Sequence, residues 1–263
     1  MVSMDRLART VREQVALGRL LPLGGPEDAA WITERTAVAA LRTVCAALPG
    51  VRLGRVDVLP AADGDGGPDQ PDLPAAAPLG ALPHRPLRIK AGFEAVVGEP
   101  LPVMAERLRT ALFAAAGEDG LGLPVRVVDL AVTGLIDDPE EPSAAVGSGR
   151  GRTELEGDSA DDEESGQSGV QGTAQAARAA EAAVRAVPGV ARLTRRLTGR
   201  GGVRVRDTEA PAGPARHVQL QIATARSFRP LAVAREAATA ATTATTPGAP
   251  GPVSTAVIIT DIT

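Results

Sequence analysis

The sequence predicts an α+β protein built from two α-β-β-α-β units, each with two helices on one face of a three-stranded mixed sheet. Three observations predict this fold. A helix–strand–strand–helix–strand pattern occurs twice, the first helix of each copy stops at Pro-Gly-Val, and an acidic segment separates the copies. The chain has 263 residues, of which only 2% are aromatic, and such thin cores suit two small domains better than one large one.

An apolar stripe with helical spacing opens each unit. In the first unit the stripe is Val38, Leu41, Cys45 and Leu48. The positions 139 residues further on are Ala177, Ala180, Val184 and Val187. Both stripes run into Pro-Gly, at 49–50 and 188–189. Proline disfavours helical geometry in the residue before it and glycine readily ends a helix, so both helices are expected to stop there.

The later elements follow in the same order in both copies. Short strands are expected around Val56 and Val58 and around Val203 and Val205. Residues 87–97 and 218–224 alternate between apolar and polar side chains, which is typical of strands with one wet face. In the second of these, Gln219, Gln221 and Ala223 are expected to point outward. Segments that open with Pro-Leu, at 100–116 and 230–246, predict helices, and 125–135 and 253–262 predict the closing strands.

Composition then sets the expected domain boundaries. A stretch poor in apolar residues and rich in Asp, Glu, Gly and Ser predicts a disordered linker. The expected parts are an N-terminal helix (1–25), a first domain (26–136) with a Pro/Gly-rich loop (60–86), the acidic linker (137–172) and a second domain (173–263).

The ordered set of motifs resembles the alkaline shock protein family, in two tandem copies of an actinobacterial type. The second copy carries the resemblance best, from "AAEAAVRAVPGVARLTRRLTGRGGVRV" to "VSTAVIITDIT", and the first copy is similar in "TERTAVAALRTVCAALPGV" and "VRVVDLAVTGL". The resemblance implies a non-enzymatic scaffold in bacterial cell-envelope homeostasis or stress response. It also implies a membrane-anchored partner or self-association, and it defines no catalytic residues. The second copy of the unit, the acidic insert and the extra N-terminal helix depart from the family pattern.

No catalytic, cofactor or metal site is expected. Cys45 lies on the apolar stripe and is expected to be a core residue, and His84 and His217 lie far from it in the sequence. The segment "DGDGGPD" at 63–69 lacks the final bidentate Glu of a calcium loop. An enzyme is therefore not expected.

One arginine-rich turn, residues 192–206, is the candidate site for a partner or an anion. Its arginines are Arg192, Arg195, Arg196, Arg200, Arg204 and Arg206. The turn also holds a Gly-x-x-Gly match at 199–202, so KH-like binding of RNA or of another anionic surface is the alternative function. A further hypothesis is that the acidic linker masks this turn.

Charge and hydropathy predict where the protein acts. The net charge of −4 argues against general attraction to nucleic acid. The N-terminal residues lack the apolar run of a signal peptide, and no stretch is apolar enough to span a bilayer. We expect a cytoplasmic protein, peripheral to the inner face of the membrane if its partner is anchored there.

Overall fold

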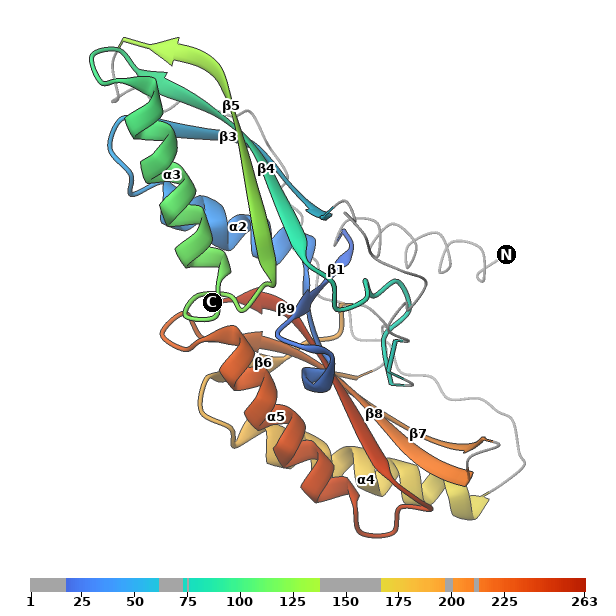
Figure 1. Ribbon diagram of the computed structural model, residues 1–263. Helices are drawn as coiled ribbons and strands as arrows, with labels where there is room; N and C mark the ends of the chain where they lie inside the picture. Colours follow the sequence, from blue (N-terminus) through green and yellow to red (C-terminus); the bar gives the residue numbers. More distant parts are fainter. Residues whose placement is uncertain (1–17, 62–72, 75, 138–166, 197–200, 211–212) are drawn as a thin grey trace, which may run out of the picture.

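The computed structural model describes residues 18–61, 73–74, 76–137, 167–196, 201–210 and 213–263. These residues form an α+β fold with two mixed sheets (Figure 1). No helix among them is long and apolar enough to cross a membrane.

The smaller sheet has the predicted three-stranded mixed form. Its strands lie in the order β3-β4-β5, with β3 antiparallel and β5 parallel to β4. Helices α2 and α3 pack on one face, where they share a core with the alternating buried residues of β4. We call this part the first unit; its elements are α2 (Glu34–Cys45), β3 (Val51–Pro60), β4 (Leu87–Val96), α3 (Leu101–Ala116) and β5 (Val125–Ile136).

The larger sheet differs from the prediction, because it has six strands rather than three. Strand β9 is parallel to β8, whereas β6 and β7 pair antiparallel with successive parts of β8. We call this part the second unit; its elements are α4 (Gln167–Arg185), β6 (Val190–Leu193), β7 (Val203–Ala210), β8 (Gly213–Thr224), α5 (Pro230–Thr245) and β9 (Val253–Ile262). Helix α4 begins inside the range predicted as linker, whose residues 138–166 lie outside the described residues.

The remaining two strands of the larger sheet come from the segment before α2. Strands β1 (Leu20–Leu23) and β2 (Ala30–Thr33) form an antiparallel pair around a short 3-10 turn, Pro26–Asp28. Strand β2 then pairs in parallel with β9. The expected helix over 1–25 is therefore wrong at its end, where Leu20–Leu23 is a buried strand, and residues 1–17 lie outside the described part. Residues 30–33 belong to the sheet of the second unit rather than to the first domain.

The first helices end shortly before the Pro-Gly pairs rather than at them: α2 stops at Cys45 and α4 at Arg185, so Leu48 and Val187 of the predicted stripes lie in the turns that follow. Gly50 and Gly189 have φ angles of 74° and 87°, in the left-handed region that glycine adopts without strain. The buried residues of α2 include Leu41 and Cys45, and those of α4 include Val184.

A second, smaller core covers the outer face of the larger sheet. Trp31 is fully buried against Ala76 and Ala81 of the loop after β3, and its indole Nε1 donates a 2.9 Å hydrogen bond to the carbonyl of Leu82. Gln221 and Ala223 lie buried in β8, contrary to the prediction that they face water. The strand register places Gln221 beside Ile258 and Ile258 beside Trp31. These residues lie on the face of the sheet that carries the second core, so water does not reach it.

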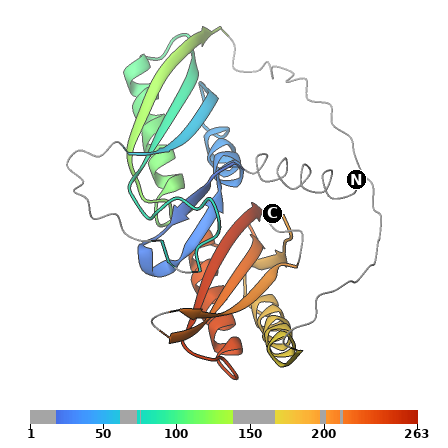
Figure 2. The ribbon, with the colours of Figure 1, turned by 90° about the vertical axis from the view of Figure 1, so that its right-hand side faces the viewer.

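The two units stack in the same orientation, the carboxyl ends of β8 and β9 pointing toward the first unit (Figures 1 and 2). Asp28 of the 3-10 turn accepts hydrogen bonds of 2.6 and 3.0 Å from Arg235 of α5. Burial acts to raise the pKa of Asp28, but bonds from Arg235 and from the Gly25 N–H outweigh it, so this pKa lies below its usual range. The hydroxyl of Thr36 in α2 donates to the carbonyl of Thr260 in β9, at 2.8 Å. The Asp28–Arg235 pair thus ties the β1–β2 segment to α5, whereas the Thr36–Thr260 bond joins the two units.

Candidate functional site: a cavity between the units

A cavity of about 580 Å³ lies where the second unit meets the first. One helical face of α2 forms part of its wall, because residues 35, 36, 39, 40, 43 and 44 recur at the spacing of a single helix side. The loop after α3 contributes Asp119, Gly120 and Leu121, and the loop between β8 and α5 contributes residues 226–230. The end of β9 completes the lining with residues 260–262. The size falls within the range of sites that hold small ligands.

The acidic side chains of the cavity already have basic partners. Asp261 pairs with Arg192 at 2.6 Å, and Asp119 pairs with Arg229 at 3.0 Å. Both pairs are solvent-exposed, so each contributes little to stability. The negative charge of the lining is therefore neutralised.

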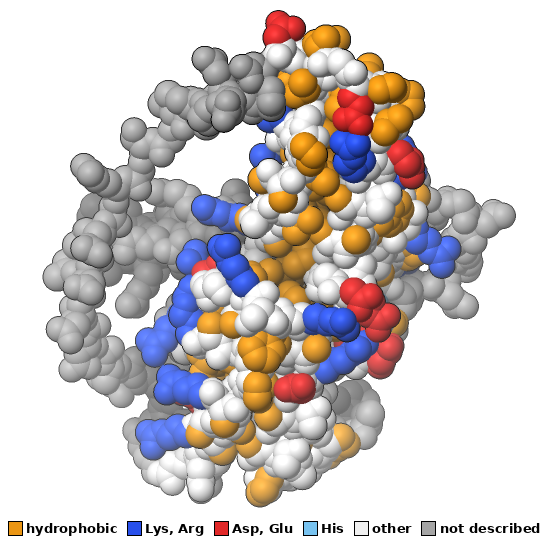
Figure 3. Space-filling model, turned by 90° about the vertical axis from the view of Figure 1, so that its left-hand side faces the viewer, with side chains coloured by type: hydrophobic (Ala, Val, Ile, Leu, Met, Phe, Trp, Pro, Cys, Tyr) orange, Lys and Arg blue, Asp and Glu red, His pale blue; other side chains and the backbone are white. Residues whose placement is uncertain are grey.

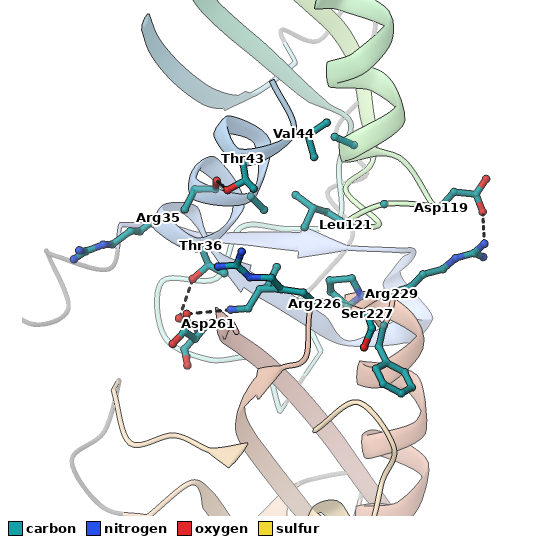
Figure 4. Close-up of a pocket in the computed structure, with 18 of the residues that line it drawn as sticks. Arg35, Thr36, Thr43, Val44, Asp119, Leu121, Arg226, Ser227, Arg229 and Asp261 are labelled. Carbon is teal, nitrogen blue, oxygen red and sulfur yellow. Dashed lines mark hydrogen bonds and ion pairs between the residues drawn. The ribbon is translucent and has the colours of Figure 1, made fainter. Parts of the chain in front are cut away.

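Three lining arginines remain without an ionic partner among the described residues: Arg35, Arg196 and Arg226. Figure 4 shows Arg226 in the same corner of the cavity as Thr36 and Asp261, whereas Arg35 extends outward at the rim. The cavity thus carries an excess of positive charge.

The rest of the lining is largely apolar. Ala39, Ala40 and Val44 of α2 face Leu121 of the loop after α3. Val44 keeps 46% of its surface exposed, which is high for an apolar side chain in a folded protein. Figure 3 shows hydrophobic side chains between the upper and lower parts of this face, with basic side chains near them. A basic corner beside an apolar wall suits binding better than proton transfer.

The structure separates the arginines that the sequence grouped into one turn. Arg192 lies on β6, Arg204 and Arg206 lie on β7, and only Arg196 lines the cavity. Arg195 is exposed next to it, and Arg200 lies outside the described residues. Residues 192–193 and 203–206 of the predicted turn therefore belong to strands β6 and β7, which both pair with β8. RNA binding by this stretch stays a prediction, which a salt titration of binding would test.

Sequence reasoning missed Arg35 and Arg226. One signal existed: the loop at 225–230 reads Ala-Arg-Ser-Phe-Arg-Pro, whereas the corresponding loop before Pro100 reads Val-Gly-Glu. Two arginines close together in this loop, and none in the loop before Pro100, indicate a local role.

The other chemical candidates do not come together. Cys45 is buried in α2, His84 lies 5.0 Å from the ring of Trp31, and His217 bonds Ser254 in the larger sheet. No group of three or more potential metal ligands exists among the residues that the structure describes.

The Cys45 thiol is expected to be unreactive in the folded protein. Burial raises its pKa to about 11, so the nucleophilic thiolate is scarce near neutral pH. A chromogenic disulfide reagent should label Cys45 only after denaturant is added. Rapid labelling of the native protein would contradict the buried position.

Comparisons with protein-family models, with curated proteins and with solved structures gave no match.

Proposed function

We propose that this chain is a non-enzymatic scaffold of the alkaline shock type, made of two units that arose by duplication. Its role would be in bacterial cell-envelope homeostasis or stress response, on the cytoplasmic side of the membrane. The scaffold acts by docking other proteins, with a second copy of the same chain as its first partner.

The observation that carries the proposal is a difference between matching ends of the units. Leu231, at the start of α5, is only 3% exposed, because it lies against Gly122 of the first unit and against Gly24 of the β1–β2 turn. Leu101 occupies the same place at the start of α3 and is 36% exposed. The first unit therefore covers the end of the second, while no described residue covers its own end, which we call the free end.

The free end of the first unit is apolar. We define it by Val97, Leu101, Val103, Val132 and Leu135, which are among the exposed large hydrophobic residues. Figure 3 shows several hydrophobic side chains at this upper end of the molecule. Exposed apolar groups gathered in this way mark interaction surfaces more often than chance exposure does.

The occupant that fits best is the opposite end of a second copy. Within one chain, the matching end of the second unit already meets the side of α2 and the loop between α3 and β5 of the first unit, in head-to-tail order. The second unit offers the same two parts at its far end: α4, with exposed alanines such as Ala182, and the loop from Thr246 to Pro252 (Figure 1). Copies joined head to tail form an open array, or a ring where the rotation between neighbours closes.

Charges placed on the free end should abolish self-association. Val97→Lys and Leu135→Lys both alter exposed residues, so folding should be retained. In sedimentation velocity, the wild-type sedimentation coefficient should rise with concentration, and the double variant should stay monomeric. Leu79→Lys, at a loop residue that is 96% exposed, is the matched control and should associate like the wild type. A wild-type protein that remains monomeric at every concentration would contradict the proposal.

A further inference from the structure

We propose that the cavity between the units binds an amphipathic oxyanion, a small molecule with a carboxylate or phosphate head and an apolar tail. This site is separate from the free end of the first unit, and it adds a ligand to the proposed scaffold.

The head group is recognised by arginine. Arg226 and Arg196 line the cavity with no ionic partner among the described residues, and the nearby carboxylate of Asp261 is already held by Arg192. A guanidinium presents a planar fork of donors that matches the two oxygens of a carboxylate or phosphate. An incoming oxyanion would give these arginines an ionic partner without breaking an existing ion pair.

The tail is recognised by the wall of α2. Ala39, Ala40 and Val44 form an apolar strip with Leu121, and their small side chains leave room for a linear chain. The ring of Phe228 does not fill this room, because it lies against Gly189 on the side of the second unit. A purely inorganic anion would leave this wall in contact with water, whereas an alkyl tail would cover it.

Both units contribute to the site. Arg226 and Arg196 belong to the second unit, and the apolar strip belongs to the first. A ligand that contacts both would favour the stacked arrangement over any state in which the units separate, and so would raise the unfolding temperature. Binding and stabilisation are two readouts of the same event.

Isothermal titration calorimetry tests the inference with four small-molecule probes: octanoate, octyl phosphate, octanol and inorganic phosphate. Octanoate, octyl phosphate or both should bind, and should raise the thermal unfolding temperature. Octanol lacks the head and inorganic phosphate lacks the tail, so both should bind about tenfold more weakly or worse. If either binds as tightly as the amphiphiles, or if neither amphiphile binds, the inference is wrong.

Variants locate the site. Replacing both Arg196 and Arg226 with Gln should weaken binding of the amphiphile by about tenfold or more, because charge-assisted hydrogen bonds are lost. Arg206→Gln removes one arginine charge from the exposed face of β7, away from the cavity, and should leave the affinity unchanged. If the Arg196/Arg226 double variant binds the amphiphile as tightly as Arg206→Gln does, the assignment of the site is wrong. Because neither variant touches the free end, sedimentation of the same proteins tests self-association independently.

Discussion

Replacing Gly189 with alanine is expected to destabilise the protein by about 3 kcal/mol. Its φ of 87° costs an alanine roughly 1–2 kcal/mol. An added Cβ would also lie 2.6 Å from Cγ2 of Val233 and 2.7 Å from Cγ of Phe228. Phe228 is 44% exposed and can move, but Val233 is buried, so the overlap adds a cost of packing strain.

Gly50→Ala is the matched control for this prediction. Gly50 follows proline in the first unit and has a similar φ of 74°, yet the nearest atom to an added Cβ is 3.5 Å away. This variant should lose only about 1–2 kcal/mol from backbone strain. Urea denaturation followed by circular dichroism and by the fluorescence of Trp31 measures both variants. An equal loss in the two would show that the packing against Val233 contributes nothing.

Replacing Asp207 with alanine is expected to lower the free energy of unfolding by about 3 kcal/mol, because it leaves the buried Arg216 without its ionic partner. The side chain of Arg216 is only 2% exposed and donates to both oxygens of Asp207, at 2.7 and 2.8 Å. It also donates to the carbonyls of Thr245 and Gly248, so it ties the β7–β8 hairpin to the end of α5. These carbonyls remain in the variant but cannot neutralise the charge. A loss below about 1 kcal/mol in urea denaturation would mean that the guanidinium finds water instead.

The same ion pair makes stability depend on pH. Hydrogen bonds from Arg216 lower the pKa of Asp207, so the folded protein holds its proton less tightly than the unfolded chain does. The contribution of the pair is therefore complete above the ordinary aspartate pKa of about 4, and it is lost as the pH falls through the lowered value. The difference in unfolding free energy between wild type and Asp207→Asn should shrink on acidification below about pH 4. A difference that stays constant would rule out this linkage.

Local patterns predicted the element types well. Period-two alternation placed Ile89 and Phe93 on one buried face of β4, and helical spacing placed Leu41 and Cys45 in the core. The Pro-Gly pairs located the ends of α2 and α4 to within a few residues, because their effect is local. In each case the deciding contacts lie within a few residues of each other in the sequence.

Pairing between distant segments could not be predicted in the same way. Strands β1 and β2 have four residues each, and Pro22 and the glycines that follow indicated a helix end rather than a strand pair. Their position depends on β9, more than two hundred residues away, and on the burial of Trp31. Such short strands are stable only through these tertiary contacts.

The site was predicted even less completely, because the cavity exists only where the two units meet. Of the predicted arginines, Arg196 alone lines it, while Arg226 comes from the loop before α5 and Arg35 from the start of α2. The sequence indicated the right kind of charge but could not show which arginines come together.

The most direct test of the head-to-tail scaffold is an intermolecular cross-link between opposite ends. Leu135→Cys places a thiol on the free end, Pro250→Cys places one on the exposed loop after α5, and the native Cys45 is buried and should not compete. Mixing the two single variants under mild oxidation should give disulfide-linked dimers between different variants, and few between identical ones. Dimers formed mainly between two Leu135→Cys chains, or none at all, would contradict the account.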